Sequence, residues 1–440
     1  MRIDEPTLRL NYRQIGLLEH VGYGNLGDDA TVAAVKHHIN LRWNEAQIVA
    51  ITLHPHDTQK RHGITSYPIR RDCKALISRV VPQNKLKTAL RNYPVLTSIL
   101  RIVKAVAIRA PLAIFQETVF LVKSLRITKS LDLLVICGGG QLRDASVGPY
   151  KFPYSIFKWV ALAKVTGTRC YFVNLGAGPL KSFRSRFLFK YALALSDYIS
   201  FRDIKSQLLI QETGFTGTSR VHADCVYGLP LPEACLCRHA SSDAPPVVGI
   251  SPMQVFWDKD PKVYAHLIGE LGRFGAWLAR RQHCLQLFST EVWSDYQPIG
   301  DLKAAIQHEF GSPSITCPSI DGITSLLTGM AAMDYIVTCR FHGVVFAHLL
   351  NIPVLAIAHH PKVATMMNDI GLSDYCLDIN TFNFDQLTET FNRLVANKAD
   401  IKARMAERAG HYRRELTVQF DSLFRPSTSG RPQGVGTVSA

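Results

Sequence analysis

The chain has 440 residues, of which 47% are hydrophobic and 19% charged, and its formal net charge is +15. This length and balance exclude a disordered chain and favour two globular domains. No stretch approaches the ~18 uncharged apolar residues of a membrane span. The first six residues contain no apolar signal region, so we expect a cytoplasmic protein.

The ten cysteines are scattered along the chain. Cys137, Cys170 and Cys339 lie in apolar, strand-like runs, which favours buried thiols in a reducing compartment. Cys235 and Cys237 form a close pair, but no second pair stands at zinc-ligand spacing. We therefore predict no metal site.

The positive charge is concentrated in residues 70–129, which contain thirteen lysines and arginines but only two acidic residues, a net charge of +11. Within this segment, residues 95–109 have helical periodicity. At ~100° per residue, Arg101, Lys104 and Arg109 share an arc of roughly 140°. Such a face is either an ordinary solvated one or lies on an anionic membrane surface.

The N-terminal part begins with an apolar strand that runs into the turn Gly24-Asn25-Leu26-Gly27-Asp28, and a helix follows. A strand, a glycine-rich turn and a helix are typical of an anion-binding α/β start. The glycine spacing departs from the dinucleotide-binding pattern, so we do not predict a dinucleotide site. The structural alternative is a tight turn with an acidic residue in the first helical turn, where the helix dipole favours it.

Another predicted strand, 131–137, ends at three consecutive glycines, Gly138, Gly139 and Gly140. Glycines at a strand end let backbone N–H groups approach a ligand closely. The alternative is a turn beneath close packing.

Two later strands of this half end in charged residues. Residues 198–201 lead into Arg202 and Asp203, and residues 221–223 lead into Asp224. Arg202 can reach a ligand at the carboxyl end of its strand. Alternatively, Arg202 and Asp203 cap the helix that follows.

The strand Tyr335–Thr338 is followed at once by Arg340 and His342. On an extended backbone, both side chains would point to the same side. Gly343 then precedes an apolar helix over 344–350. Because ligands bind beyond the carboxyl ends of parallel strands, the pair predicts a ligand site with a permanent cation and a titratable imidazole. The alternative is a helix-capping pair.

The next apolar strand ends at His360 and Lys362. Two consecutive strands therefore deliver Arg, His and Lys at their carboxyl ends. Basic side chains at strand ends and helix N-termini are typical of an anion site.

The order of these motifs resembles that of the polysaccharide pyruvyl transferase family over most of residues 15–380. The motifs are the Gly-Asn-x-Gly-Asp turn, the three glycines, the Arg-Asp pair, Asp224, Arg-x-His-Gly at 340–343 and Pro-Lys-Val at 361–363. The resemblance implies an enzyme that moves the pyruvyl group of phosphoenolpyruvate onto hydroxyls of a sugar, forming a ketal.

The resemblance also implies the fold: two doubly wound, Rossmann-like α/β domains that face each other across a cleft, as in glycosyltransferase-B enzymes. We predict the following parts: an N-terminal domain, 1–227, with a basic helical insert at about 70–129; a linker, 228–246; a C-terminal domain, 247–425; and a disordered tail, 426–440.

The implied roles are as follows. His342 is the general acid, because imidazole titrates near neutral pH, and Arg340 is the second catalytic residue. Arg340, Arg202 and Lys362 hold the anionic donor, and Asp28 or Asp203 accepts a hydroxyl proton. The predicted substrate-binding residues are Arg202, Lys362, Asn25, Asp28, Gly138, Gly139, Gly140, Asp203 and Asp224.

The predicted partners are phosphoenolpyruvate, a saccharide acceptor carried on a lipid, and an anionic surface on the inner face of the membrane. We expect no resident cofactor and no nucleic acid. Two alternatives stay open. A glycosyltransferase of the same architecture would use these cations to hold a nucleotide sugar. A non-enzymatic membrane- or nucleic-acid-binding protein would explain the charge of +15 but not the clustering of Arg340, His342 and Lys362.

Overall fold

The computed structural model describes residues 13–19, 24–71, 110–144, 152–236, 244–254 and 261–424. These residues form two compact units. The N-terminal unit comprises Gln14–Tyr23 and Ile48–Val221, and the C-terminal unit comprises the remainder, including Gly24–Gln47. The predicted helix 95–109, with Arg101, Lys104 and Arg109, and the predicted tail from 426 lie outside the described residues.

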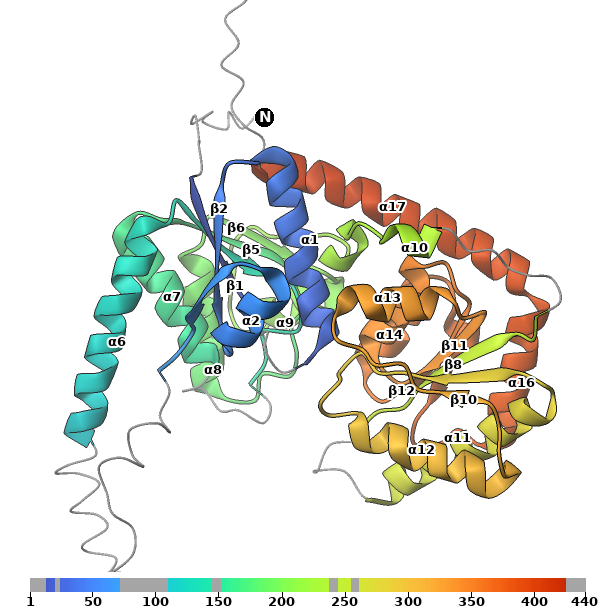
Figure 1. Ribbon diagram of the computed structural model, residues 1–440. Helices are drawn as coiled ribbons and strands as arrows, with labels where there is room; N and C mark the ends of the chain where they lie inside the picture. The colour runs from blue at the N-terminus through green and yellow to red at the C-terminus, as the bar shows by residue number, and fades with distance from the viewer. Residues whose placement is uncertain are drawn as a thin grey trace, which may run out of the picture. The chain divides into compact units, whose positions relative to one another are not determined.

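The N-terminal unit is built on a seven-stranded sheet with the order β3-β2-β1-β4-β5-β6-β7 (Figure 1). The neighbours β2 and β3, β1 and β4, β4 and β5, β5 and β6, and β6 and β7 pair in parallel. Strands buried on both faces need continuous apolar runs, and β4 has one. The strands are β1 (Gln14–Leu18), β2 (Gln47–Thr52), β3 (Thr65–Pro68), β4 (Leu133–Cys137), β5 (Arg169–Leu175), β6 (Tyr198–Phe201) and β7 (Arg220–Val221).

The helices of this unit are α2 (Pro55–His62), α6 (Ala110–Ser130), α7 (Phe152–Thr166), α8 (Phe183–Ala194) and α9 (Ile204–Gln211). Helix α7 lies between α6 and α8 and contacts both (Figure 1). The core between helices and sheet includes the fully buried side chains of Trp159, Phe172, Phe189 and Phe201.

The C-terminal unit contains a six-stranded parallel sheet with the order β10-β9-β8-β11-β12-β13. Its strands are β8 (Val247–Ser251), β9 (Cys284–Leu287), β10 (Ile315–Thr316), β11 (Tyr335–Thr338), β12 (Val354–Ala358) and β13 (Cys376–Asp378). Both sheets thus reverse their strand order in the doubly wound manner, beside β1 and β4 in one and beside β8 and β11 in the other.

The helical elements of the C-terminal unit are α1 (Leu26–Arg42), η2 (Cys225–Gly228), α10 (Glu233–Leu236), α11 (Pro261–Arg280), α12 (Tyr296–Phe310), α13 (Ile323–Ala331), α14 (Phe341–Leu349), α15 (Pro361–Asp369), η3 (Ser373–Tyr375), α16 (Phe384–Ala396) and α17 (Lys398–Phe424). Within the described ranges, no helix combines the length and the apolar character needed to cross a membrane.

Helix α1 belongs to the C-terminal unit because it packs on α17, although it follows β1 in the chain. The ring of His38 stacks on Phe420 with 4.3 Å between centroids. Arg42 forms an ion pair of 2.7 Å with Asp421. These contacts fix α1, and with it the glycine-rich turn at its N-terminus.

The chain after β11 differs from the prediction. Helix α14 begins at Phe341 and not at Val344, so His342 lies in the first helical turn and not on an extended backbone. Gly343 permits this early start, since a Cβ there would lie 2.2 Å from Oγ1 of Thr338. The strand alternation from which the sequence placed Arg340 and His342 on one side therefore does not apply here.

Candidate active site

The carboxyl ends of β8 and β11 form the topological switch point of the C-terminal sheet, where ligands bind in doubly wound folds. The two strands pair in parallel, with Thr338 opposite Ser251. The N–H of Cys339 continues the ladder by donating to the carbonyl of Ser251 over 3.1 Å. Arg340 thus leaves the sheet directly at the switch point.

Arg340 is almost fully buried, and carboxylates surround its guanidinium. Nε donates to Oδ2 of Asp295 over 3.0 Å, and Nη2 donates to Oδ1 of the same carboxylate. Nη1 donates to Glu291, and Nη2 also donates to the hydroxyl of Ser294 over 3.0 Å. The bidentate contact with Asp295 is the fork geometry in which arginine binds most strongly.

The electrostatics agree with this pairing. Burial alone lowers the pKa of Arg340, but the charges of Asp295 and Glu291 outweigh it and leave the pKa raised. Asp295 has no exposed surface and also accepts from the Ser289 hydroxyl over 2.8 Å. The sequence predicted that Arg340 holds the donor anion. The structure directs its fork at protein carboxylates, and the predicted role of Arg340 in holding the donor stays a prediction.

His342 lies against the N-terminus of α1. A Cβ on Gly27 would lie 1.9 Å from Nδ1 of His342, so the imidazole rests on the bare backbone of that glycine. Asn25 caps α1 by accepting from the N–H groups of Gly27 and Asp28 over 3.0 and 3.4 Å. The turn predicted to bind substrate and the predicted general acid are therefore brought together within one unit.

A second segment holds the turn in place. The N–H of Leu26 donates to Thr290 over 2.9 Å, and the N–H of Val292 donates to Gly24 over the same distance. Gly24 has a φ of +71°, and a Cβ there would lie 3.2 Å from the indole of Trp293. The segment that follows β9 thus contacts both predicted motifs: it supplies the carboxylates for Arg340, and its Glu291 forms an isolated β-bridge with Asn25.

Lys362 lies in the first turn of α15, next to α14. Its Nζ is 5.7 Å from the centre of the Phe341 ring, so it is close to the start of the helix that carries His342. His359 lies just before it and donates from Nδ1 to the carbonyl of Cys339 over 2.8 Å. Burial, followed by the charges of Lys362 and Arg340, lowers the pKa of His359 to about 3. This histidine stays neutral near pH 7.

The N-terminal unit brings together its own predicted residues. Gly138 to Gly140 follow β4 at the switch point of its sheet. The carbonyl of Gly139 accepts from the N–H of Gly176 over 2.7 Å. A Cβ on Gly176 would lie 2.6 Å from Nε of Arg202, so the guanidinium rests on this glycine. At Gly140 a Cβ would meet nothing within 4 Å, which leaves open space beside the turn.

Two predicted carboxylates accept hydrogen bonds from the backbone at the start of a helical element. Asp203 caps α9 by accepting from the N–H of Ser206 over 2.6 Å, and it lies 3.7 Å from Arg202. Asp224 is buried and accepts from the N–H of Val226 over 3.1 Å at the start of η2. Both side chains thus support local structure, and their predicted role in substrate binding stays a prediction.

Sequence reasoning missed Glu291, Asp295 and His359. The first two stand after β9, and two carboxylates four residues apart beyond an apolar run were the available signal. His359 precedes the predicted His360, and its burial is visible only in the structure.

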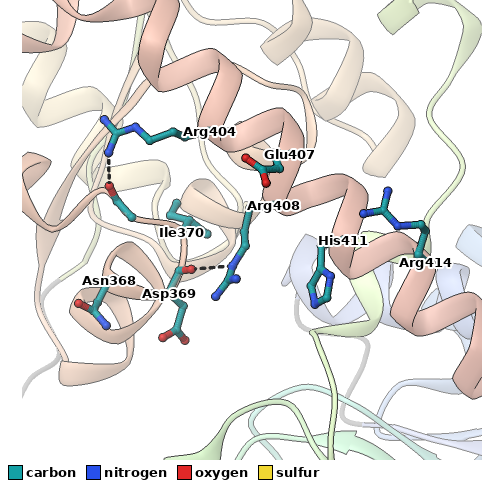
Figure 2. A pocket seen from close by; sticks show the side chains of 9 residues that line it. Asn368, Asp369, Ile370, Arg404, Glu407, Arg408, His411 and Arg414 are labelled. Carbon is teal, nitrogen blue, oxygen red and sulfur yellow. Dashed lines mark hydrogen bonds between the residues drawn. The ribbon is translucent and has the colours of Figure 1, made fainter.

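The C-terminal end of α15 borders a groove of about 480 Å³ on α17 (Figure 2). Arg404 donates to the carbonyl of Gly371 over 3.0 Å, and Arg408 donates to that of Asp369 over 2.9 Å. Helix ends need such partners for their last carbonyls. These arginines therefore fix the helix whose opposite end carries Lys362.

Solved structures share this fold at low sequence identity. The UDP-GlcNAc 2-epimerase from Neisseria meningitidis, bound to UDP-GlcNAc, has a TM-score of 0.53 and 11% identity, covering 92% of this chain and 98% of that one. A glycosyltransferase from Rickettsia africae has a TM-score of 0.51 and 13% identity, covering 94% and 98%. These similarities confirm a glycosyltransferase-B-like fold of two Rossmann-like sheets.

Curated proteins yield no match to the sequence. A family model described as polysaccharide pyruvyl transferase matches residues 25–361, a span that starts at the cap of α1 and ends at the first residue of α15. The match therefore contains the α1 turn, the glycine turn of β4, Arg202 and the start of α14. Since it covers well over half of the sequence, the chain belongs to the polysaccharide pyruvyl transferase family.

Proposed function

We propose that this transferase moves the pyruvyl group of phosphoenolpyruvate onto two hydroxyls of one sugar in a polysaccharide or its lipid-linked precursor. The observation that carries the proposal is the position of His342. This residue lies in the first turn of α14 and rests on Gly27 of α1, and Lys362 lies nearby in the first turn of α15. A group that can transfer a proton thus lies among helix N-termini, which attract anions.

The chemistry needs a proton at the methylene carbon of the donor. Protonation makes the adjacent carbon electrophilic, and a sugar hydroxyl adds to it. The second hydroxyl then displaces phosphate, the C–O bond to phosphate breaks, and a cyclic ketal results. His342 supplies the first proton as general acid. Lys362 binds the anionic donor and stabilises the departing phosphate. No resident metal or cofactor is part of this scheme.

In the N-terminal unit, we assign substrate binding to Arg202 and to the turn Gly138–Gly140, because a buried guanidinium and the exposed Gly140 lie at the carboxyl edge of that sheet. Asn25 shapes the α1 turn. Asp28 lies in the first turn of α1 and is a candidate acceptor of the hydroxyl proton, as is Asp203. Arg340 positions the segment that follows β9.

The second candidate is a glycosyltransferase that uses a nucleotide sugar. Its support is the fold, which is shared with a UDP-GlcNAc 2-epimerase and with a glycosyltransferase. The test incubates the protein with a saccharide acceptor and either phosphoenolpyruvate or nucleotide sugars, and reads the products by mass together with phosphate release. A mass gain of one pyruvate ketal with phosphate release supports the proposal. Sugar transfer without reaction of phosphoenolpyruvate would support the alternative.

The acceptor and the place of action belong to the same proposal. Polysaccharide repeat units are commonly assembled on a lipid carrier at the inner membrane face, and the net charge of +15 would favour an anionic surface there. A non-enzymatic binder would show salt-dependent binding without turnover.

Replacing Gly27 by alanine is expected to lower turnover by about 10²-fold, because the new methyl group would occupy the place of the His342 imidazole. Turnover and thermal unfolding of the variant are compared with those of Gly269→Ala, a helical position where a Cβ meets nothing within 4 Å. Gly269→Ala should behave like the wild type. Equal turnover of the two variants would show that the contact does not position His342.

A further inference from the structure

Helix α8 presents a stripe of aromatic side chains to solvent. Phe183 is 79% exposed, Phe187 48% and Tyr191 44%. They stand four residues apart, which places them along one side of the helix. The rings of Phe187 and Tyr191 also contact each other, with 4.5 Å between centroids. Three large rings in a row on a helix surface form an exposed apolar patch, which is typical of an interaction site.

The opposite side of α8 is part of the core. Ser185, Phe189, Ala192 and Leu193 are buried, and the helix packs against α7. The helix is therefore held firmly, and the aromatic stripe is not needed to close the core of the N-terminal unit.

Basic residues flank the stripe. At ~100° per residue, Arg186 and Lys190 lie on one side of it and Arg184 on the other. Lys181 stands just before the helix, and no acidic residue occurs between 179 and 196. The patch is thus apolar at its centre, and the only charged residues that the helix itself contributes to its edges are cationic.

We propose that this surface, the α8 face, docks on an anionic lipid bilayer. Aromatic rings favour the boundary between headgroups and acyl chains, and lysine and arginine are attracted to anionic headgroups. A second copy of the chain is a poorer occupant, because two identical cationic faces repel each other. The α8 face lies outside the basic segment 70–129, and its docking is independent of which group the enzyme transfers.

The α8 face also lies at the functional edge of its sheet. The N–H groups of Lys181 and Ser182 donate to the carboxylate of Asp144 over 3.0 and 2.6 Å, and Asp144 follows the turn Gly138–Gly140 closely in the chain. Helix α8 therefore begins beside the carboxyl edge of the N-terminal sheet. If the proposed lipid-linked acceptor is correct, docking would bring it to this edge.

The test measures cosedimentation of the full chain with vesicles of phosphatidylcholine alone or mixed equally with phosphatidylglycerol, at low and high salt. Lys181→Gln/Lys190→Gln should lower the partition coefficient on anionic vesicles about 25-fold, about fivefold per charge. Its control, Lys60→Gln/Lys303→Gln, removes the same charge from exposed positions elsewhere and should bind as the wild type does.

The aromatic stripe has its own variant and control. Phe183→Ser/Phe187→Ser should lower binding about tenfold or more. Leu41→Ser/Val418→Ser removes side chains that are 64% and 69% exposed in the C-terminal unit and should have no effect. Because all four positions are exposed, the variants should unfold at the wild-type temperature.

Three results would overturn the proposal. The first is no binding of the wild type to anionic vesicles at low salt. The second is equal loss in the α8 variants and their controls, which would assign binding to overall charge. The third is self-association of the wild type that Phe183→Ser/Phe187→Ser abolishes while vesicle binding persists, which would assign the face to a second copy. Transfer activity on a water-soluble acceptor is measured in parallel and reports on the proposed function separately.

Discussion

Replacing His342 by alanine is expected to lower turnover by roughly 10²–10⁴-fold, the usual contribution of a general acid. Phosphoenolpyruvate should still bind, because Lys362 and the helix N-termini are unchanged. The protein should also stay folded, since His342 is only half-buried and lies in the first turn of α14, where alanine keeps the helix. Turnover, donor affinity by calorimetry and thermal unfolding measure the three expectations.

Two further variants sharpen this result. His342→Asn keeps a polar side chain over Gly27 but cannot deliver a proton near neutral pH, so it should be about as slow as His342→Ala. His308→Ala removes a histidine whose side chain is 88% exposed and serves as the matched control. Turnover of His342→Ala near that of His308→Ala would remove His342 from the mechanism.

Much of the fold could be predicted from the sequence, because short apolar runs bounded by glycine define buried parallel strands. The strand Tyr335–Thr338 has the predicted bounds, and the predicted glycine turn Gly138–Gly140 stands at a switch point. The start of α14 was misplaced. His342 and Gly343 are weak helix formers, and only the packing of Gly343 on Thr338 shows why the helix begins before them.

The partners of Arg340 could not be predicted in the same way. Asp295 stands 45 residues earlier in the chain and reaches Arg340 from the segment that follows β9, a strand that pairs with β8 and not with β11. Likewise, the turn at Gly24–Gly27 follows β1 of the N-terminal unit but belongs to the C-terminal unit. Both features depend on tertiary packing, which the local periodicity of the sequence does not predict.

Removing one partner of the buried ion pair should destabilise the protein strongly. Asp295→Ala is expected to lower the free energy of unfolding by about 3–5 kcal/mol, because it leaves most of the Arg340 charge uncompensated in a buried site. Arg340→Met should lower the free energy of unfolding by a similar amount, since it leaves the fully buried carboxylate of Asp295 without its cation. Asp295→Leu/Arg340→Met should cost less than the sum, because neither charge is then left alone. Denaturant unfolding measures all three, and Arg273→Met, which removes an exposed ion pair with Glu270, is the control and should change little.

Arg340→Lys then separates the two roles considered for this residue. If the guanidinium binds the donor, as the sequence predicts, lysine should weaken the affinity for phosphoenolpyruvate and leave the stability intact. If it positions the segment after β9, as the geometry indicates, lysine cannot replace the contacts with Asp295, Glu291 and Ser294 together. We then expect lower stability and slower turnover with nearly unchanged donor affinity. Arg340→Lys could instead keep the wild-type free energy of unfolding and lose much of its donor affinity. That result would show that Arg340 binds the anionic donor.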